Sequence, residues 1–185
     1  MIISIAGLPG AGKSTLAKKL AEDLGWPFYS MGSLRRQVAL DKGMTLAEYN
    51  LLGETDPETD LAVDRYQQAL GQKEDNFVIE GRTSWHFIPQ SVKIFLSVES
   101  RVGAERIWHQ LQKNEINRNE DKDLQNIDDV LKSNINRLAS DKKRYQKYFG
   151  FDANDIKHFD LVVDTTNLTK DEVLAEIKDF IANRP

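Results

Sequence analysis

The sequence has no cysteine among its 185 residues, so disulfides and thiolate metal sites are excluded. It also lacks any apolar run near the roughly 20 residues that a membrane-spanning helix needs. The apolar start is only a few residues long and leads directly into a glycine-rich turn, so we expect no signal peptide and a cytoplasmic location. Because the net charge of −4 is small, we expect neither nucleic acid nor an anionic membrane as the main partner.

Histidine is scarce, which limits the chemistry that the chain can perform. His86, His109 and His158 are scattered without the spacing of metal ligands, and no serine nucleophile arrangement is visible. No asparagine is followed by lysine, so the Asn-Lys-x-Asp motif with which switch GTPases read their base is absent. The sequence therefore does not favour a histidine-metal site, a catalytic triad or a switch GTPase.

Short β-like runs alternate with helical patterns along the chain, and the length fits a single domain, residues 1–185. The runs cover residues 2–6, 26–30, 77–79, 92–96 and 159–163, of which the second is weak. This alternation indicates an α/β fold with a parallel sheet.

A phosphate-binding pattern follows the first run. The motif G-x-x-x-x-G-K-[ST] is matched by Gly7, Leu8, Pro9, Gly10, Ala11, Gly12, Lys13, Ser14 and Thr15. Glycine lets such a loop curl with its N–H groups inward, and the helix that begins near Lys13 adds free N–H groups and partial positive charge. We expect Lys13 to contact the β- and γ-phosphates of ATP and Ser14 to bind Mg²⁺.

Two helical inserts interrupt the alternation. They span residues 33–76 and 101–149 and leave a core of residues 1–32, 77–100 and 150–185. In phosphate-loop proteins such inserts usually carry the second substrate and a closing lid.

Several helix starts can be placed from local signals. Thr45 and Thr169 each open a capping box, and Asp56 precedes a proline that suits the first helical position. The last helix places an apolar stripe on one side, which we expect to pack on the sheet: Val173, Leu174, Ile177, Phe180 and Ile181.

Phosphoryl transfer needs positive charge to align two anionic substrates, and arginine is the preferred clamp for phosphate oxygens. Arg82 comes just after the run 77–79, at the strand end where ligands bind in parallel sheets. Glu80, two residues before it, is placed to hold a water on Mg²⁺. A plain salt bridge between Glu80 and Arg82 is the alternative.

Three further arginines lie in the inserts. Arg36 follows a turn after the run 26–30, and we expect its neighbour Arg35 to point elsewhere on the same helix. Arg137 and Arg144 are seven residues apart, so they share a helix face and could hold the acceptor phosphate and the γ-phosphoryl group together. A solvated stripe is the alternative for this pair.

The loop "GLPGAGKST", with a proline between glycines, resembles that of nucleoside monophosphate kinases. The whole chain is similar to the archaeal-type cytidylate kinase branch, through "YSMGSLRRQVALDKGMTLAEYN", "ETDPETDLAVDRYQ", "VIEGR", "INRLASDKKRYQKYFGFD" and "FDLVVDTTNLTKDEV". The resemblance implies a P-loop NTPase fold: a five-stranded parallel sheet flanked by helices, with a nucleoside monophosphate-binding insert and a lid. It also implies phosphoryl transfer from Mg·ATP to CMP or dCMP.

The resemblance further implies a set of phosphate ligands: Arg36, Arg82, Arg137 and Arg144. Arg144 would stabilise the migrating phosphoryl group with Lys13, and the other three would hold the acceptor phosphate.

Two more roles follow from the resemblance. Asp64 and Arg65 would read the cytosine edge, because such a pair can accept from the exocyclic amine and donate to the ring carbonyl. Arg106 matches a lid arginine that binds ATP. The chain departs from the family at Gln110, where lids generally carry a second arginine.

We therefore expect an ATP-dependent nucleoside monophosphate kinase that acts as a monomer on small nucleotides, with ATP and Mg²⁺. Two alternatives stay open: a kinase for another small acceptor, and an ATP-binding regulatory module without phosphoryl transfer. The missing lid arginine is the observation that supports the second.

Overall fold

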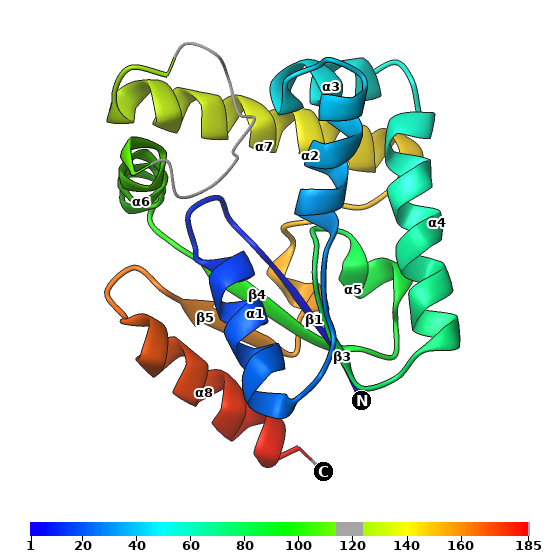
Figure 1. Ribbon diagram of the computed structural model, residues 1–185, viewed down its shortest axis with the longest axis vertical. Helices are drawn as coiled ribbons and strands as arrows, with labels where there is room; N and C mark the ends of the chain where they lie inside the picture. Colours follow the sequence, from blue (N-terminus) through cyan, green and yellow to red (C-terminus); the bar gives the residue numbers. More distant parts are fainter. Residues whose placement is uncertain (114–123, 185) are drawn as a thin grey trace.

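A computed structural model describes residues 1–113 and 124–184. Within these residues the strands form one parallel sheet in the order β2-β3-β1-β4-β5 (Figure 1). The strands are β1 (Ile2–Gly7), β2 (Phe28–Ser30), β3 (Phe77–Glu80), β4 (Val92–Ser97) and β5 (Leu161–Asp164). Every residue of β1 and β3 is buried, as expected for central strands covered on both faces. The predicted fold class and all five runs are confirmed.

Two strands start later than their runs predicted. β2 begins at Phe28 because the carbonyl of the preceding Pro27 accepts from Val78 N (3.0 Å), and Trp26 turns back onto α1. β5 begins at Leu161 because residues Ile156–His158 form a 3₁₀ turn directly before it. Strand ends are fixed by such neighbouring contacts, which an apolar run does not reveal.

One face of the sheet is covered by α1 (Lys13–Leu24) and α8 (Lys170–Ala182) (Figure 1). The predicted capping box at Thr169 is present, and the predicted stripe packs inward through Val173, Leu174 and Ile177. These side chains join those of the strands in one apolar core. Burial of this stripe fixes the end of the chain on the sheet.

The other face is covered by α4 (Glu58–Lys73) and α5 (Ser84–Phe87). Trp85 of α5 packs with Phe95 of β4 and with aromatic side chains that follow α7. The α4 helix starts one residue later than predicted, with Pro57 as its cap residue, and Asp56 Oδ1 still accepts from Glu58 N (3.0 Å).

The remaining helices lie beyond the carboxyl ends of the strands (Figure 1). They are α2 (Met31–Asp41) and α3 (Leu46–Gly53) in the first insert, and α6 (Ser100–Gln112) and α7 (Ile127–Phe149) in the second. The predicted capping box at Thr45 opens α3. Because α3 and α7 are in contact, the two inserts meet above the sheet.

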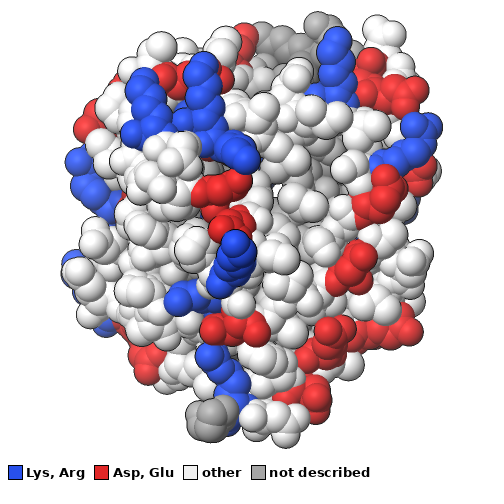
Figure 2. Space-filling model, turned by 180° about the vertical axis from the view of Figure 1, so that it is seen from behind, with Lys and Arg blue, Asp and Glu red and all other residues white. Residues whose placement is uncertain are grey.

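The surface gives two further observations. On the face shown in Figure 2, Lys and Arg side chains are interspersed with Asp and Glu. Among the described residues no helix has the length and apolarity to cross a membrane.

Candidate functional site

The predicted phosphate loop joins β1 to α1, as the strand–loop–helix context required. Gly10 has a φ of 78°, and a Cβ there would clash with the backbone of Gly103 at the start of α6. Gly7, at the end of β1, has a φ of 144°, and a Cβ would clash with the carbonyl of Leu96 in β4. Only glycine fits these two positions, so the loop runs tightly between β4 and α6.

A cleft of about 200 Å³ opens beside this loop. Its polar walls come from the loop and α1, from α2, α4 and α7, and from the segment after β3. The charged or hydroxyl-bearing residues that line it include Lys13, Ser14, Thr15, Arg35, Arg36, Asp60, Asp64, Glu80, Arg82, Thr83, Arg137 and Asp141. The cleft thus brings the phosphate loop and both inserts together.

Lys13 lies over its own loop. Its Nζ donates to the carbonyl of Leu8 at 2.7 Å, which bends the side chain back across the glycines. Pro9, Gly10 and Gly12 line the cleft next to it. The ammonium group is therefore already at the place where a bound polyphosphate would follow the loop.

Ser14 and Glu80, the predicted Mg²⁺ ligands, both line the cleft. Glu80 is buried and its Oε2 accepts from Ser30 Oγ (2.8 Å), a side chain that also caps α2 by accepting from Ser33 N. In the described residues no three His, Asp or Glu side chains form a metal cluster. A hydroxyl and a single carboxylate suit Mg²⁺, which keeps water and substrate phosphates as its other ligands.

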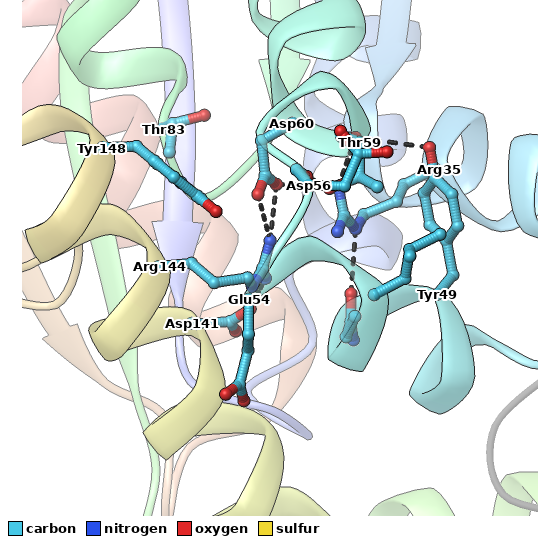
Figure 3. A network of polar contacts seen from close by, with 12 residues as sticks. Arg35, Tyr49, Glu54, Asp56, Thr59, Asp60, Thr83, Asp141, Arg144 and Tyr148 are labelled. Carbon is cyan, nitrogen blue, oxygen red and sulfur yellow. Dashed lines mark hydrogen bonds and ion pairs between the residues drawn. The ribbon is translucent and has the colours of Figure 1, made fainter.

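Arg35 and Arg36 of α2 both line the cleft, so the expectation that Arg35 points elsewhere is wrong. Arg35 donates to Asn50 Oδ1 (2.9 Å), to the carbonyl of Thr59 (2.8 Å) and to Asp60 Oδ1 (2.7 Å) (Figure 3). Adjacent helical residues point about 100° apart. The cleft extends far enough around α2 that the side chains of Arg35 and Arg36 both line it.

Arg82 also lines the cleft, and its ion-pair partner is Asp141 of α7. The alternative of a Glu80–Arg82 salt bridge is not what the structure has, since Glu80 bonds Ser30 instead. Burial and the nearby charge of Arg137 lower the pKa of Arg82. Such crowding of positive charge is relieved when an anion binds.

Comparisons with known proteins identify the family of the chain. The model of the cytidylate kinase-like family matches residues 2–167 of the chain. The chain belongs to this family. The resemblance read from the sequence is thereby confirmed.

Relatives in the cytidylate kinase-like family match nearly the whole chain. The cytidylate kinase of Methanosphaera stadtmanae is 34% identical over 185 residues, covering 100% of this chain and 99% of the relative. That of Methanocella arvoryzae is 37% identical over 166 residues, covering 90% and 88%. Shikimate kinase from Bacteroides thetaiotaomicron superposes with a TM-score of 0.60 at 15% identity, covering 98% of both chains, which shows a shared fold alone.

Arg144 does not line the cleft, although the family resemblance implied a phosphate ligand there. It is 1% exposed and donates to Asp60 and Asp141, between α4 and α7 (Figure 3). Seven residues of helix span about 10 Å. Arg137 lines the cleft, as does Tyr145 beyond it. The Arg144 side chain instead points between Asp60 of α4 and Gly53 at the end of α3.

Two other predicted ligands lie outside the cleft. Arg65 is exposed and pairs with Glu58 at 2.7 Å, because it points away from its buried neighbour Asp64 on α4. Arg106 donates to Thr165 Oγ1 (3.1 Å) and to the carbonyls of Thr165 and Thr166, so it is held against the loop after β5. Gln110, one turn later on α6, does line the cleft.

Asp64 is buried within the cleft wall. Its Oδ1 accepts from Gln67 Nε2 (2.8 Å) and Thr83 Oγ1 (3.1 Å), while its Oδ2 has no hydrogen-bond partner among the described residues. Burial, with the nearby charge of Asp60, raises the pKa of Asp64 to about 7.

Sequence reasoning missed Asp60, Thr83 and Asp141, which line the cleft, and Gln67, which lies behind it and donates to Asp64. Asp141 has a signal, since it lies four residues after Arg137 and three before Arg144, the spacing of helical ion pairs. Asp60, Asp64 and Gln67 likewise follow one another at helical spacing on α4. These polar residues on a half-buried helix face could have been recognised as part of a site.

Proposed function

We propose that the protein transfers the γ-phosphoryl group of Mg·ATP to CMP or dCMP, giving ADP and CDP or dCDP. One observation carries this proposal: a single cleft joins the phosphate loop to a separate wall of guanidinium groups. The loop provides Lys13 and Ser14, and the wall provides Arg36, Arg82 and Arg137. A donor polyphosphate and an acceptor phosphate thus have distinct binding places that face each other. The names of the archaeal relatives support cytidylate as the acceptor.

The chemistry requires alignment and charge stabilisation. An oxygen of the acceptor phosphate forms the new bond to the γ-phosphorus, and the bond from that phosphorus to the β-γ bridging oxygen breaks, which releases ADP. Lys13 stabilises the charge on the β- and γ-phosphates, and Arg36, Arg82 and Arg137 hold the acceptor phosphate. Ser14, and Glu80 through a water, would hold Mg²⁺, which would supply positive charge to neutralise the phosphates.

The acceptor base is read by Asp64 in this proposal. Asp64 lines the cleft, and its Oδ2, which has no hydrogen-bond partner among the described residues, can accept from the exocyclic amine of cytosine. Arg65 has no part in base recognition, since it lies at the surface with Glu58. The inserts 33–76 and 101–149 act as the acceptor-binding unit and the lid. We further infer a monomer that acts on nucleotides, not nucleic acid, in the cytoplasm; gel filtration checks the oligomeric state.

The proposal is tested by replacing the lysine of the loop. Lys13→Ala should lower turnover of CMP by at least about 100-fold, because it removes a charge that stabilises the transition state. Lys19→Ala is the matched control, since Lys19 lies on the same helix and pairs with Asp23 at the surface. Near-normal turnover in Lys13→Ala, with the fold intact by circular dichroism, contradicts the proposal.

The acceptor is identified by a coupled assay of ADP release. CMP, dCMP, UMP, AMP, shikimate and gluconate are offered in turn at the same ATP concentration. We expect CMP or dCMP to give the highest kcat/KM. A higher rate with shikimate or gluconate favours another small-molecule kinase. ATP binding without ADP release from any acceptor favours a regulatory module.

A further inference from the structure

A buried chain of side-chain hydrogen bonds lies behind Asp64. Ser84 Oγ donates to Gln67 Oε1 (2.8 Å), and Gln67 Nε2 donates to both Asp64 Oδ1 (2.8 Å) and Thr83 Oγ1 (2.8 Å). Gln67 and Ser84 are completely buried, at 0% exposure. The chain joins α4 to α5 through polar groups that have no access to water.

The orientation of the Gln67 amide is determined by its two neighbours. Ser84 donates to its oxygen, and its nitrogen faces Asp64. In the reversed orientation the amide oxygen would lie against the carboxylate of Asp64, and two acceptors would meet in a buried place. The carboxylate of Asp64, which only accepts, thus determines that Gln67 is a donor toward it, and the Ser84 hydroxyl donates to the amide oxygen on the other side.

The two carboxylate oxygens of Asp64 consequently differ in their hydrogen bonds. Gln67 and Thr83 both bond its Oδ1, whereas its buried Oδ2 has no partner among the described residues. A buried carboxylate oxygen without a donor is costly, so the site favours a ligand that supplies an N–H group. Cytosine offers an amine at this edge, and uracil offers a carbonyl oxygen in its place.

Resting on the proposed function, we infer that Gln67 is a positioning residue that sets the preference for a cytosine over a uracil monophosphate. It acts through Asp64, by keeping Oδ1 occupied and Oδ2 free as an acceptor. It does not line the cleft itself.

The groups around Asp64 shift its pKa in opposite directions. Asp60 on α4 raises the pKa of Asp64, while Arg35 of α2 and the hydrogen bonds from Thr83 and Gln67 lower it. His86, the titratable residue of α5, packs against Phe87 and Phe151. Removing the Gln67 amide therefore raises the pKa of Asp64 further. More of the protein then carries a protonated Asp64, whose O–H group can donate to the carbonyl of uracil.

The test compares Gln67→Leu with Gln68→Leu, which changes the adjacent, exposed glutamine of the same helix. We expect Gln67→Leu to raise the KM for CMP about tenfold at neutral pH, with kcat changed less than about twofold. The ratio of kcat/KM for CMP to that for UMP should fall about tenfold or more, which is about 1.4 kcal/mol of discrimination. Gln68→Leu should keep the wild-type ratio.

A pH series separates positioning from a merely structural role. The loss in Gln67→Leu should shrink at high pH, where Asp64 is ionised again without the amide. Ser84→Ala is the second variant if Gln67→Leu does not fold, and it should lower the CMP-to-UMP ratio in the same direction. An unchanged ratio in a folded variant, or a loss that is equal for CMP and UMP at every pH, overturns the inference.

The wild-type protein distinguishes this inference from the proposed function. If it phosphorylates neither CMP nor dCMP, the proposed function fails. If it phosphorylates CMP and UMP equally well, the inference fails while the proposed function stands.

Discussion

Arg137 and Arg144 lie two turns apart on α7, and the structure gives them different surroundings. Arg137 lines the cleft, whereas Arg144 is buried between two carboxylates (Figure 3). Asp141 stands between them and pairs with Arg144 on one side and with Arg82 on the other. The same residue type at the same helix phase can therefore line the cleft or form part of the wall behind it. The element packed against each arginine determines which of these two surroundings it has.

The largest expected effect is on stability, at Arg144. Arg144→Leu removes the buried cation that Asp60 and Asp141 share, while Arg35 and Arg82 still pair with them. The free energy of unfolding should therefore fall by about 3 kcal/mol, the low end for a broken buried pair. Urea denaturation measures this. A variant that loses turnover but unfolds at the wild-type urea concentration would show that Arg144 acts on the substrate after all.

The second effect is on turnover, at Arg137. Arg137→Leu should lower kcat/KM for CMP about 100-fold, because one donor to the phosphate is lost in the transition state. Its urea midpoint should stay close to that of the wild type. If Arg137→Leu and Arg144→Leu lose kcat/KM and urea stability in the same proportion, the two arginines do not differ in role.

The third effect is a pH dependence that comes from Asp64. Its carboxylate must be ionised to accept from cytosine, and its pKa is raised to about 7. The kcat/KM for CMP should therefore fall about tenfold as the pH is lowered from about 8 to about 6. In Asp64→Asn this titration is absent and only that of the substrate phosphate remains. The difference between the pH profiles of the wild type and this variant therefore gives the contribution of Asp64. Parallel profiles in the two proteins would contradict the assignment.

The smallest effect is expected at Arg65, which neither lines the cleft nor fills the protein interior. Its ion pair with Glu58 is exposed, and such pairs contribute little. Arg65→Ala should change turnover of CMP less than about twofold and leave the urea midpoint unchanged. A large rise in the KM for CMP would restore Arg65 to base recognition.

The sequence allowed the fold and the phosphate loop to be predicted because both depend on local patterns. The runs from β1 to β5, the capping boxes at Thr45 and Thr169, and the strand–loop–helix around Lys13 are each specified by neighbouring residues. The phosphate-loop motif placed Ser14, and the direction of the strand before them placed Glu80 and Arg82, at what is one cleft.

The arginines of the helices could not be assigned in the same way. Helical spacing gives the face on which Arg36, Arg65 or Arg144 lies, but not the element packed against that face. Arg144 meets α4, and Arg106 meets the loop after β5, and both contacts join segments far apart in the chain. The helical spacing of Asp60 and Asp141 marks them as polar residues on a half-buried face, but their partners Arg35, Arg82 and Arg144 follow only from the packing.

The contact of Gly10 with Gly103 has a mechanical consequence. Here the main chain of the phosphate loop rests directly on the first turn of α6, and a Cβ on Gly103 would come within 2.6 Å of the Pro9 carbonyl. A single methyl group at either position would push the two backbones apart. Because no side chain separates them, the phosphate loop and the first turn of α6 keep a spacing that their two backbones alone determine.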